Sequence, residues 1–346
     1  MADDTRFGHR AGAAYLCRVI LEGKSICHTG RNEKGIACRQ RLRISSAIFL
    51  LFCSLSSYPQ SDSLNPVPGS DPRPVLQKKR FLAVVAGEAV LAGASVLGLN
   101  EVWYDDHTRV PLHSFNDNRE WLGMDKAGHI MASYYIGRIG IGLMKWSGAE
   151  HKRSVLYGGF LGTGYLTILE LFDGFSSGWG FSWGDMAANL AGSLMVSAQE
   201  LCWGGQRITL KFSYHPTGYP EYRPELLGRS PAEKLFKDYN GQTYWVSLNL
   251  ASFMGNGSRF PAWLNAAVGY GATGMIGGVE KFPGWQSHPS FERYPQFYIA
   301  LDADLWRIKT RSRFLKGFFS TFGFIKIPLP AIELNKYGVK VYPLYF

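Results

Sequence analysis

The distribution of apolar residues divides the chain into a helical part and a β-rich part. Apolar segments of helical length cover residues 81–99, 125–146, 153–173 and 184–203. After Gly205, short alternating runs separated by Pro and Gly indicate antiparallel strands, most clearly at 207–214, 244–250, 296–307 and 338–346. The pattern therefore predicts an α+β fold, with an N-terminal four-helix, membrane-associated bundle followed by a β-rich antiparallel C-terminal region.

The region before the first of these helices has the features of an export signal. Three arginines at 39, 41 and 43 precede the apolar run 44–55, which is too short to span a bilayer and is typical of a signal peptide. A short buried helix is the alternative. Cys53 is a candidate for lipidation, although the bulky Phe52 precedes it.

We accordingly expect four segments. They are an N-terminal extension with the signal peptide (1–57), a linker (58–77), a helical bundle with a polar motif cluster (78–205) and the β-rich region (206–346).

The segment 81–99 is ambiguous with respect to the membrane. Its length just suffices to cross a bilayer, and its small residues, Gly87 and Gly93 among them, favour close helix packing. Glu88 opposes insertion, so a helix that packs in the bundle and touches the membrane is the alternative. A mean hydropathy of −0.09 argues against a polytopic membrane protein.

Charge and cysteine content exclude several classes of function. About half of the net charge of +10 comes from residues 1–46, with nine Lys/Arg and four Asp/Glu, and no arginine-rich helix or basic-aromatic signature follows. We therefore expect no nucleic-acid partner. Cys202 is the single cysteine after Cys53, which excludes an internal disulfide or a cysteine metal cluster in that part.

Acidic and imidazole side chains occur where an ordinary apolar core has none. Residues four apart share a helix face, so Asp125 lies beside His129 and Asp185 beside Asn189, with Glu170 and Asp173 nearly aligned. Packing the three helices together would gather these groups into one polar cluster. The candidate site residues are Asp125, His129, Glu170, Asp173, Asp185 and Asn189.

Two interpretations of this cluster remain open. In the first, Asp125 and Asp185 cap helices, Glu170 pairs His129, and Asn189 ties two helices together. The network then fixes the packing of a structural or assembly protein. In the second, His129, Glu170 and Asp185 bind a divalent metal that activates water, or His129 acts as a general base with Glu170 or Asp185 as the acid. The second predicts a hydrolase of a lipid or another envelope molecule. A binding or transport role for the β-rich region is a further alternative.

Two weaker motifs lie in the C-terminal region. The glycine-rich stretch 269–278 lacks the lysine and the context of a phosphate-binding loop. Asp302 and Asp304 share one face of a predicted strand, which we interpret as a solvated face.

Several short blocks resemble the YfiM-like family of predicted periplasmic lipoproteins, over about residues 65–346. The blocks are 116–118 (NDN), 125–129 (DKAGH), 172–175 (FDGF), 179–185 (WGFSWGD) and 237–245 (KDYNGQTYW). Residues 125–192 are also similar to VanZ-like membrane proteins. These resemblances imply an exported protein of the periplasm or outer membrane, a helical core, and membrane or envelope components as partners. They imply no particular reaction.

Overall fold

The computed structural model describes residues 75–99, 108–254, 259–282 and 284–346. All of them lie in the second of two units into which the chain divides, Ser46–Phe346. The predicted signal peptide, Cys53 and most of the predicted linker lie outside the described residues.

The helical layer is built around α4, which packs against α6, α7 and the π-helical turn that precedes α6. Its elements are α3 (Lys78–Leu99), α4 (Met124–Trp146), α5 (His151–Arg153), the π-helical turn (Ser154–Gly158), α6 (Leu161–Gly174) and α7 (Trp183–Trp203). The three helices predicted between residues 125 and 203 are thus confirmed, with a break before α6.

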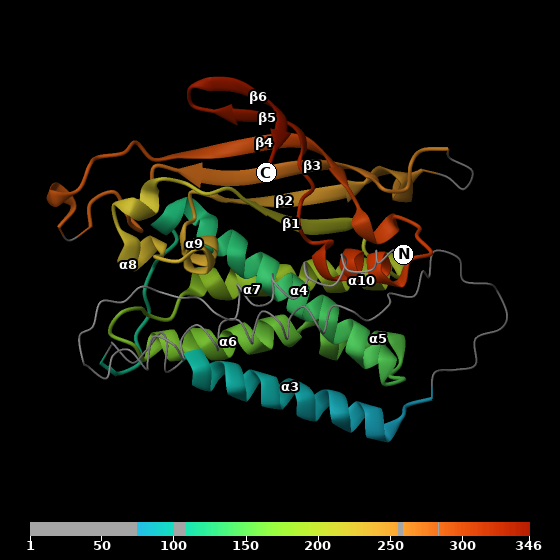
Figure 1. The fold of residues 1–346 in the computed structure, drawn as a ribbon. Coiled ribbons are helices and arrows are strands. Elements are labelled where there is room, and N and C mark those ends of the chain that lie inside the picture. Colours follow the sequence, from blue (N-terminus) through green and yellow to red (C-terminus); the bar gives the residue numbers. More distant parts are fainter. Residues whose placement is uncertain (1–74, 100–107, 255–258, 283) are drawn as a thin grey trace, which may run out of the picture. The chain divides into compact units, whose positions relative to one another are not determined.

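The C-terminal half forms one six-stranded antiparallel sheet in the sequential order β1 to β6 (Figure 1). The strands are β1 (Ile208–Tyr214), β2 (Gln242–Asn249), β3 (Leu264–Thr273), β4 (Tyr294–Ala303), β5 (Leu329–Asn335) and β6 (Gly338–Tyr345). Short helices lie between them: α8 (Pro224–Leu227), α9 (Pro231–Lys237) and α10 (Arg313–Phe322).

The sequence pattern identified four of the six strands. β3 was missed because its glycines resemble a loop. Gly269 instead lies under the indole of Trp245, where a Cβ atom would come within 2.6 Å of the ring. β5 was missed because Pro330 interrupts its alternation.

The prediction of an N-terminal four-helix bundle is wrong. The described helical core lies in the middle of the chain, between residues 120 and 203, and is part of an α+β fold. Its helices also cover the sheet: Tyr135 donates a hydrogen bond to the carbonyl of Leu210 on β1, and Gln199 donates to Ile208. Gly87 and Gly93 of α3 do not make the expected close contacts, since a Cβ atom at either position would meet nothing within 4 Å.

Close helix contact occurs instead at glycines of the helical core. A Cβ atom at Gly140 of α4 would lie 2.4 Å from the carbonyl oxygen of Gly158, and one at Gly192 of α7 would lie 2.2 Å from that of Ile130. Only glycine permits these backbones to approach so closely.

One helical stretch of the described residues, His151–Gly174, is long and apolar enough to cross a membrane, with a third of its most apolar window buried. Length and composition alone are weak evidence, because core helices pass the same test.

The interpretation of Asp302 and Asp304 as a solvated strand face is wrong. Asp302 is fully buried, with its carboxylate 2.8 Å from the equally buried Lys211 ammonium and 2.6 Å from the Ser247 hydroxyl. Asp304 accepts from Arg307 at 3.1 Å. The alternation was correct, but the apolar face of β4 is the exposed one, with Ile299 53% exposed.

The glycine contacts give a test of the helix packing. Gly140→Ala should destabilise the protein by about 1–3 kcal/mol, because the added methyl group overlaps the Gly158 backbone. Gly142→Ala, on the same helix with nothing within 4 Å, should be neutral or stabilise by up to about 1 kcal/mol. Chemical unfolding of both variants measures the difference. Equal effects would contradict the packing described.

Candidate functional site

An unusual turn starts α4 and places its first residues at the site. Trp121 and Leu122 both adopt left-handed backbone conformations, with φ of 49° and 52°, followed by Gly123 at 76°. Two non-glycine residues in this region are strained, and the surroundings must hold them. The Trp121 amide donates to the Gly278 carbonyl at 2.8 Å, and Tyr270 donates to the Leu122 carbonyl.

The start of α7 is fixed by Ser182. Its hydroxyl accepts from the Asp185 amide at 3.0 Å as the N-cap, and donates to the Asp117 carboxylate at 2.6 Å. Its own amide donates to Glu170 at 3.3 Å. Ser182 therefore connects α6, α7 and the segment before α4, and it sets the position of Asp185.

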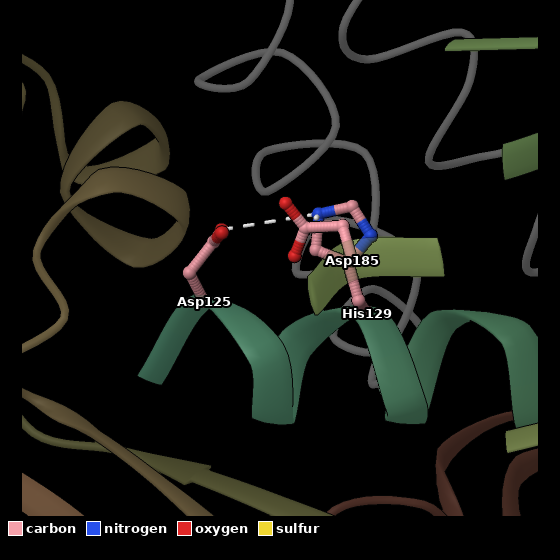
Figure 2. Close-up of side chains that lie close together, drawn as sticks. All are labelled: Asp125, His129 and Asp185. Carbon is pink, nitrogen blue, oxygen red and sulfur yellow. Dashed lines mark ion pairs between the residues drawn. The ribbon is translucent and has the colours of Figure 1, made fainter. Parts of the chain in front are cut away.

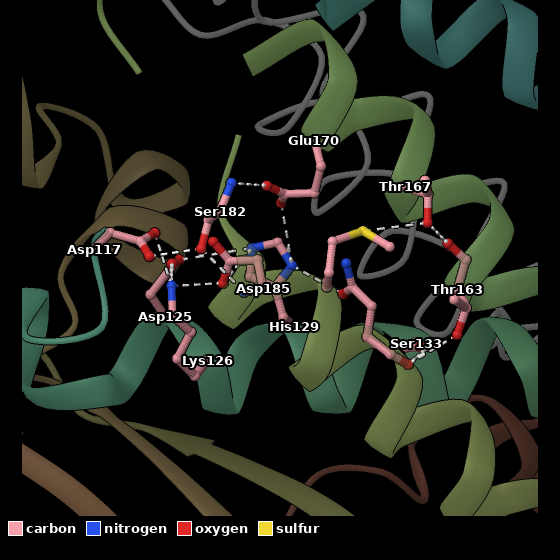
Figure 3. Close-up of polar contacts among 12 residues, drawn as sticks. Asp117, Asp125, Lys126, His129, Ser133, Thr163, Thr167, Glu170, Ser182 and Asp185 are labelled. Carbon is pink, nitrogen blue, oxygen red and sulfur yellow. Dashed lines mark hydrogen bonds and ion pairs between the residues drawn. The ribbon is translucent and has the colours of Figure 1, made fainter. Parts of the chain in front are cut away.

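Lys126 is the cation at the centre of the acidic groups (Figure 3). Its ammonium lies 2.7 Å from Asp117 and from Asp185, and 3.4 Å from Asp125. Burial opposes the charge on Lys126, but the hydrogen bonds that it donates to Asp117 and Asp185 and the nearby negative charges raise its pKa overall. The lysine therefore stays protonated and partly neutralises three carboxylates.

His129 presents one ring nitrogen to the acids and the other to an amide. Its Nδ1 lies 3.0 Å from Oδ1 of Asn189, which can only accept, so Nδ1 carries the proton. The Nε2 atom faces Asp125 Oδ1 at 3.9 Å and Asp185 Oδ1 at 3.6 Å (Figure 2). Both distances are too long for hydrogen bonds. Burial lowers the pKa of His129, but the charges of Asp125, Asp185 and Glu170 raise it overall.

Asn189 is itself held firmly. Its backbone carbonyl accepts from the Ser133 hydroxyl at 2.6 Å and from the Thr163 hydroxyl at 3.0 Å, so all three helices fix it. The orientation of His129 is therefore set by the packed helical core.

Burial raises the pKa of each buried acid of the site, and at Asp117 hydrogen bonds outweigh this effect. It raises the pKa of Glu170 to about 7, with a contribution from the charge of Asp185. It also raises the pKa of Asp185 to about 6, against the stabilising charges of His129 and Lys126. Burial likewise opposes ionisation of Asp117, but hydrogen bonds from Lys126 and Ser182 lower its pKa overall. The cluster is thus not fully compensated, which is common at functional sites.

Five of the six predicted residues meet in this cluster. The sixth, Asp173, lies almost one turn beyond Glu170 on α6, and its charge contributes to the raised pKa of Glu170.

The metal-ligand geometry differs from the predicted set of His129, Glu170 and Asp185. Within the part of the chain that the structure describes, the group with ligand atoms all within 4.8 Å of one another is Asp125, His129 and Asp185. Glu170 approaches the other side of the imidazole, with Oε1 3.9 Å from the Nδ1 that is bound to Asn189.

The site also contains four residues that helix spacing did not indicate. Tyr239, between α9 and β2, donates to Asp125 Oδ1 at 2.8 Å. The signal for all four was present in the blocks 116–118, 125–129, 179–185 and 237–245 that carry the family resemblance. The missed residues are Asp117, Lys126, Ser182 and Tyr239.

The three-residue group fits a divalent cation. Two ligand atoms bound tetrahedrally at about 2.1 Å lie about 3.4 Å apart, so small side-chain movements would bring both carboxylates and Nε2 into coordination. Hydrogen bonding of the remote ring nitrogen to Asn189 is the usual support for a metal-bound histidine.

The pKa of Glu170 gives a test of the electrostatics. Since its pKa rises from 4.5 to about 7 on folding, the protonated form stabilises the fold, and this contribution is lost as the pH rises from about 4.5 through 7. The full shift corresponds to about 3 kcal/mol, which solvent screening reduces.

The unfolding free energy should therefore fall by about 1–2 kcal/mol less between these pH values in Glu170→Gln than in the wild type. Chemical unfolding at several pH values, with a chelator present, measures this difference. Asp173→Asn is the control and should reduce the fall far less. An unchanged pH profile in Glu170→Gln would contradict the assignment.

Comparison with known proteins identifies one related family. The sequence model of a family described as predicted periplasmic lipoprotein (DUF2279) matches residues 114–198. This segment contains every residue of the site described above except Tyr239, and the block 237–245 lies outside the match.

The comparisons do not support the VanZ-like resemblance. No curated protein and no solved structure matches the chain. The family description confirms the predicted export to the cell envelope, and residues 114–198 are similar to a family of predicted periplasmic lipoproteins of unknown function.

Proposed function

We propose that this envelope protein binds a divalent metal ion at Asp125, His129 and Asp185 and uses it to hydrolyse an ester or phosphoester. The observation that supports this most directly is the position of His129 Nε2. It faces two carboxylate oxygens at 3.9 and 3.6 Å, too far for hydrogen bonds and suitable for sharing an ion.

The charge of the site also favours a cation. The site has more carboxyl groups than cationic groups. The carboxyl groups are those of Asp117, Asp125, Glu170 and Asp185, and the cationic groups are Lys126 and a protonated His129. An additional positive ion would relieve the repulsion that contributes to the raised pKa values of Glu170 and Asp185.

Each residue then has a distinct role. A bound metal supplies an acidified water molecule and a positive charge for the developing oxyanion. Asn189 holds the neutral imidazole with Nε2 toward the ion, and Tyr239 orients the Asp125 carboxylate. Lys126 remains beside Asp185 as a fixed positive charge that can bind an anionic head group.

The surroundings of the site suit a lipid substrate. Trp183 stands two residues before Asp185 and is 72% exposed, with its ring centroid 5.0 Å from that of Phe181. Phe115, whose amide donates to the Phe181 carbonyl, is 47% exposed. These apolar side chains provide a surface for an acyl chain next to the polar cluster.

A structural role for the cluster is the second candidate. Lys126 joins the segment before α4 to α7 through Asp117 and Asp185, and such a network can fix helix packing without chemistry. This role predicts no metal affinity and large stability losses on substitution.

Metal titration of the full chain by calorimetry tests the proposal. We expect stoichiometric binding of Zn²⁺ or Mn²⁺, weakened at least about 100-fold in His129→Ala and Asp185→Asn, and about 10–100-fold in Asn189→Ala. Bound metal should also raise the unfolding temperature of the wild type.

Asp173→Asn, an acid-to-amide change next to the site, is the matched control and should retain wild-type affinity. A metal-binding wild type should also hydrolyse lipid esters or phosphoesters in a chelator-sensitive manner. Absence of metal binding, combined with strong destabilisation of the His129 and Asp185 variants, would favour the structural role instead.

A further inference from the structure

A second feature, independent of the proposed metal site, is the helix α10 (Arg313–Phe322) with the segment before it. The helix has no buried residue. Phe314 is 77% exposed and Phe318, one turn later, is 45% exposed, and their rings stack with centroids 6.4 Å apart. Two adjacent exposed phenylalanines on so short a helix are costly in water.

The same region carries a strong positive charge. Residues 305–332 contain six Lys/Arg and no Asp/Glu. Four of the basic residues are exposed and lie around the start of the helix: Lys309, Arg311, Arg313 and Lys316.

These basic residues do not stabilise the helix itself. Cations near a helix N-terminus oppose its dipole, and the first turn of α10 holds no acid. The basic residues are therefore better explained by an external anionic surface.

The helix is nevertheless fixed to the fold at its far end. The Trp306 indole donates to the Ser320 carbonyl at 3.2 Å, and the Phe212 amide of β1 donates to the Phe324 carbonyl at 2.9 Å. α10 is thus presented by the protein with Phe314 and Phe318 uncovered.

We infer that α10 is a membrane-surface anchor that binds anionic phospholipid. Phe314 and Phe318 would enter the boundary between head groups and acyl chains, and the four exposed basic residues would contact lipid phosphates. Charge complementarity selects this occupant, since a basic helix with an apolar aromatic face is typical of interfacial lipid binding.

Sedimentation of the full chain with vesicles tests this inference. The protein should bind vesicles of phosphatidylcholine mixed with phosphatidylglycerol more tightly than vesicles of phosphatidylcholine alone, and high salt should weaken this binding. Each basic residue near a membrane surface contributes about fivefold in affinity. The combined variant Arg311→Glu, Arg313→Glu, Lys316→Glu should therefore lose on the order of 100-fold or more.

A charge-matched control carries the same number of reversals outside this region. Lys152→Glu, Arg229→Glu and Lys281→Glu change three exposed basic residues and should reduce binding much less. The pair Phe314→Ser and Phe318→Ser should weaken binding about tenfold or more while leaving the circular dichroism unchanged.

Tryptophan fluorescence tests whether the phenylalanine face of α10 enters the bilayer surface. In Phe318→Trp, fluorescence difference spectra against the wild type should show a blue-shifted contribution on addition of the anionic vesicles.

Equal loss of binding in both charge variants, or no binding of the wild type to anionic vesicles, would overturn the inference. Self-association of the wild type that the phenylalanine substitutions abolish, without vesicle binding, would assign this face to a second copy and also overturn it.

Discussion

The ion pairs of Lys126 are the interaction on which the site depends. Carboxylates from the segment before α4 and from α7 would repel one another in a partly buried setting, and Lys126 lies 2.7 Å from both Asp117 and Asp185. Burial and the charge of Asp185 nevertheless raise the pKa of Glu170 to about 7. This remaining imbalance is the basis of the cation binding that we propose.

Backbone geometry makes these ion pairs possible. Gly192 permits α7 to touch the backbone of α4 near Ile130, and Gly184 leaves room for the Asn118 amide, because a Cβ atom there would lie 1.9 Å from its oxygen. The left-handed pair Trp121 and Leu122 then begins α4 at the point where Asp125 and Lys126 reach the other elements. The small residues and the strained turn thus set the positions of the charged ones.

Patterns within single helices correctly predicted the positions of the helices and the residues that share a helix face. Helix spacing placed Asp125 beside His129, and the apolar periodicity located α4, α6 and α7. Spacing along one helix carries no information about which helices meet, so it included Asp173 and left out Tyr239.

Burial of charge was the least predictable property. Asp302 alternates like a solvated residue, but its partner Lys211 lies on β1, and only the folded sheet brings the two together. The same argument applies to the assignment of an N-terminal bundle. Apolar helices can pack on one another or on a sheet, and composition does not distinguish these outcomes.

The contact between Tyr239 and Asp125 makes the site depend on a residue outside the segment that matches the family. The residues related to the lipoprotein family end at 198, whereas a tyrosine beyond α9 completes the site. Tyr135 and Gln199 likewise bond to β1, so the helical segment has a face that only the sheet can cover. The unit that sequence comparison recognises is therefore smaller than the unit that folds, and exchanging residues 114–198 between proteins would transfer most of the polar groups without the surface that orients them.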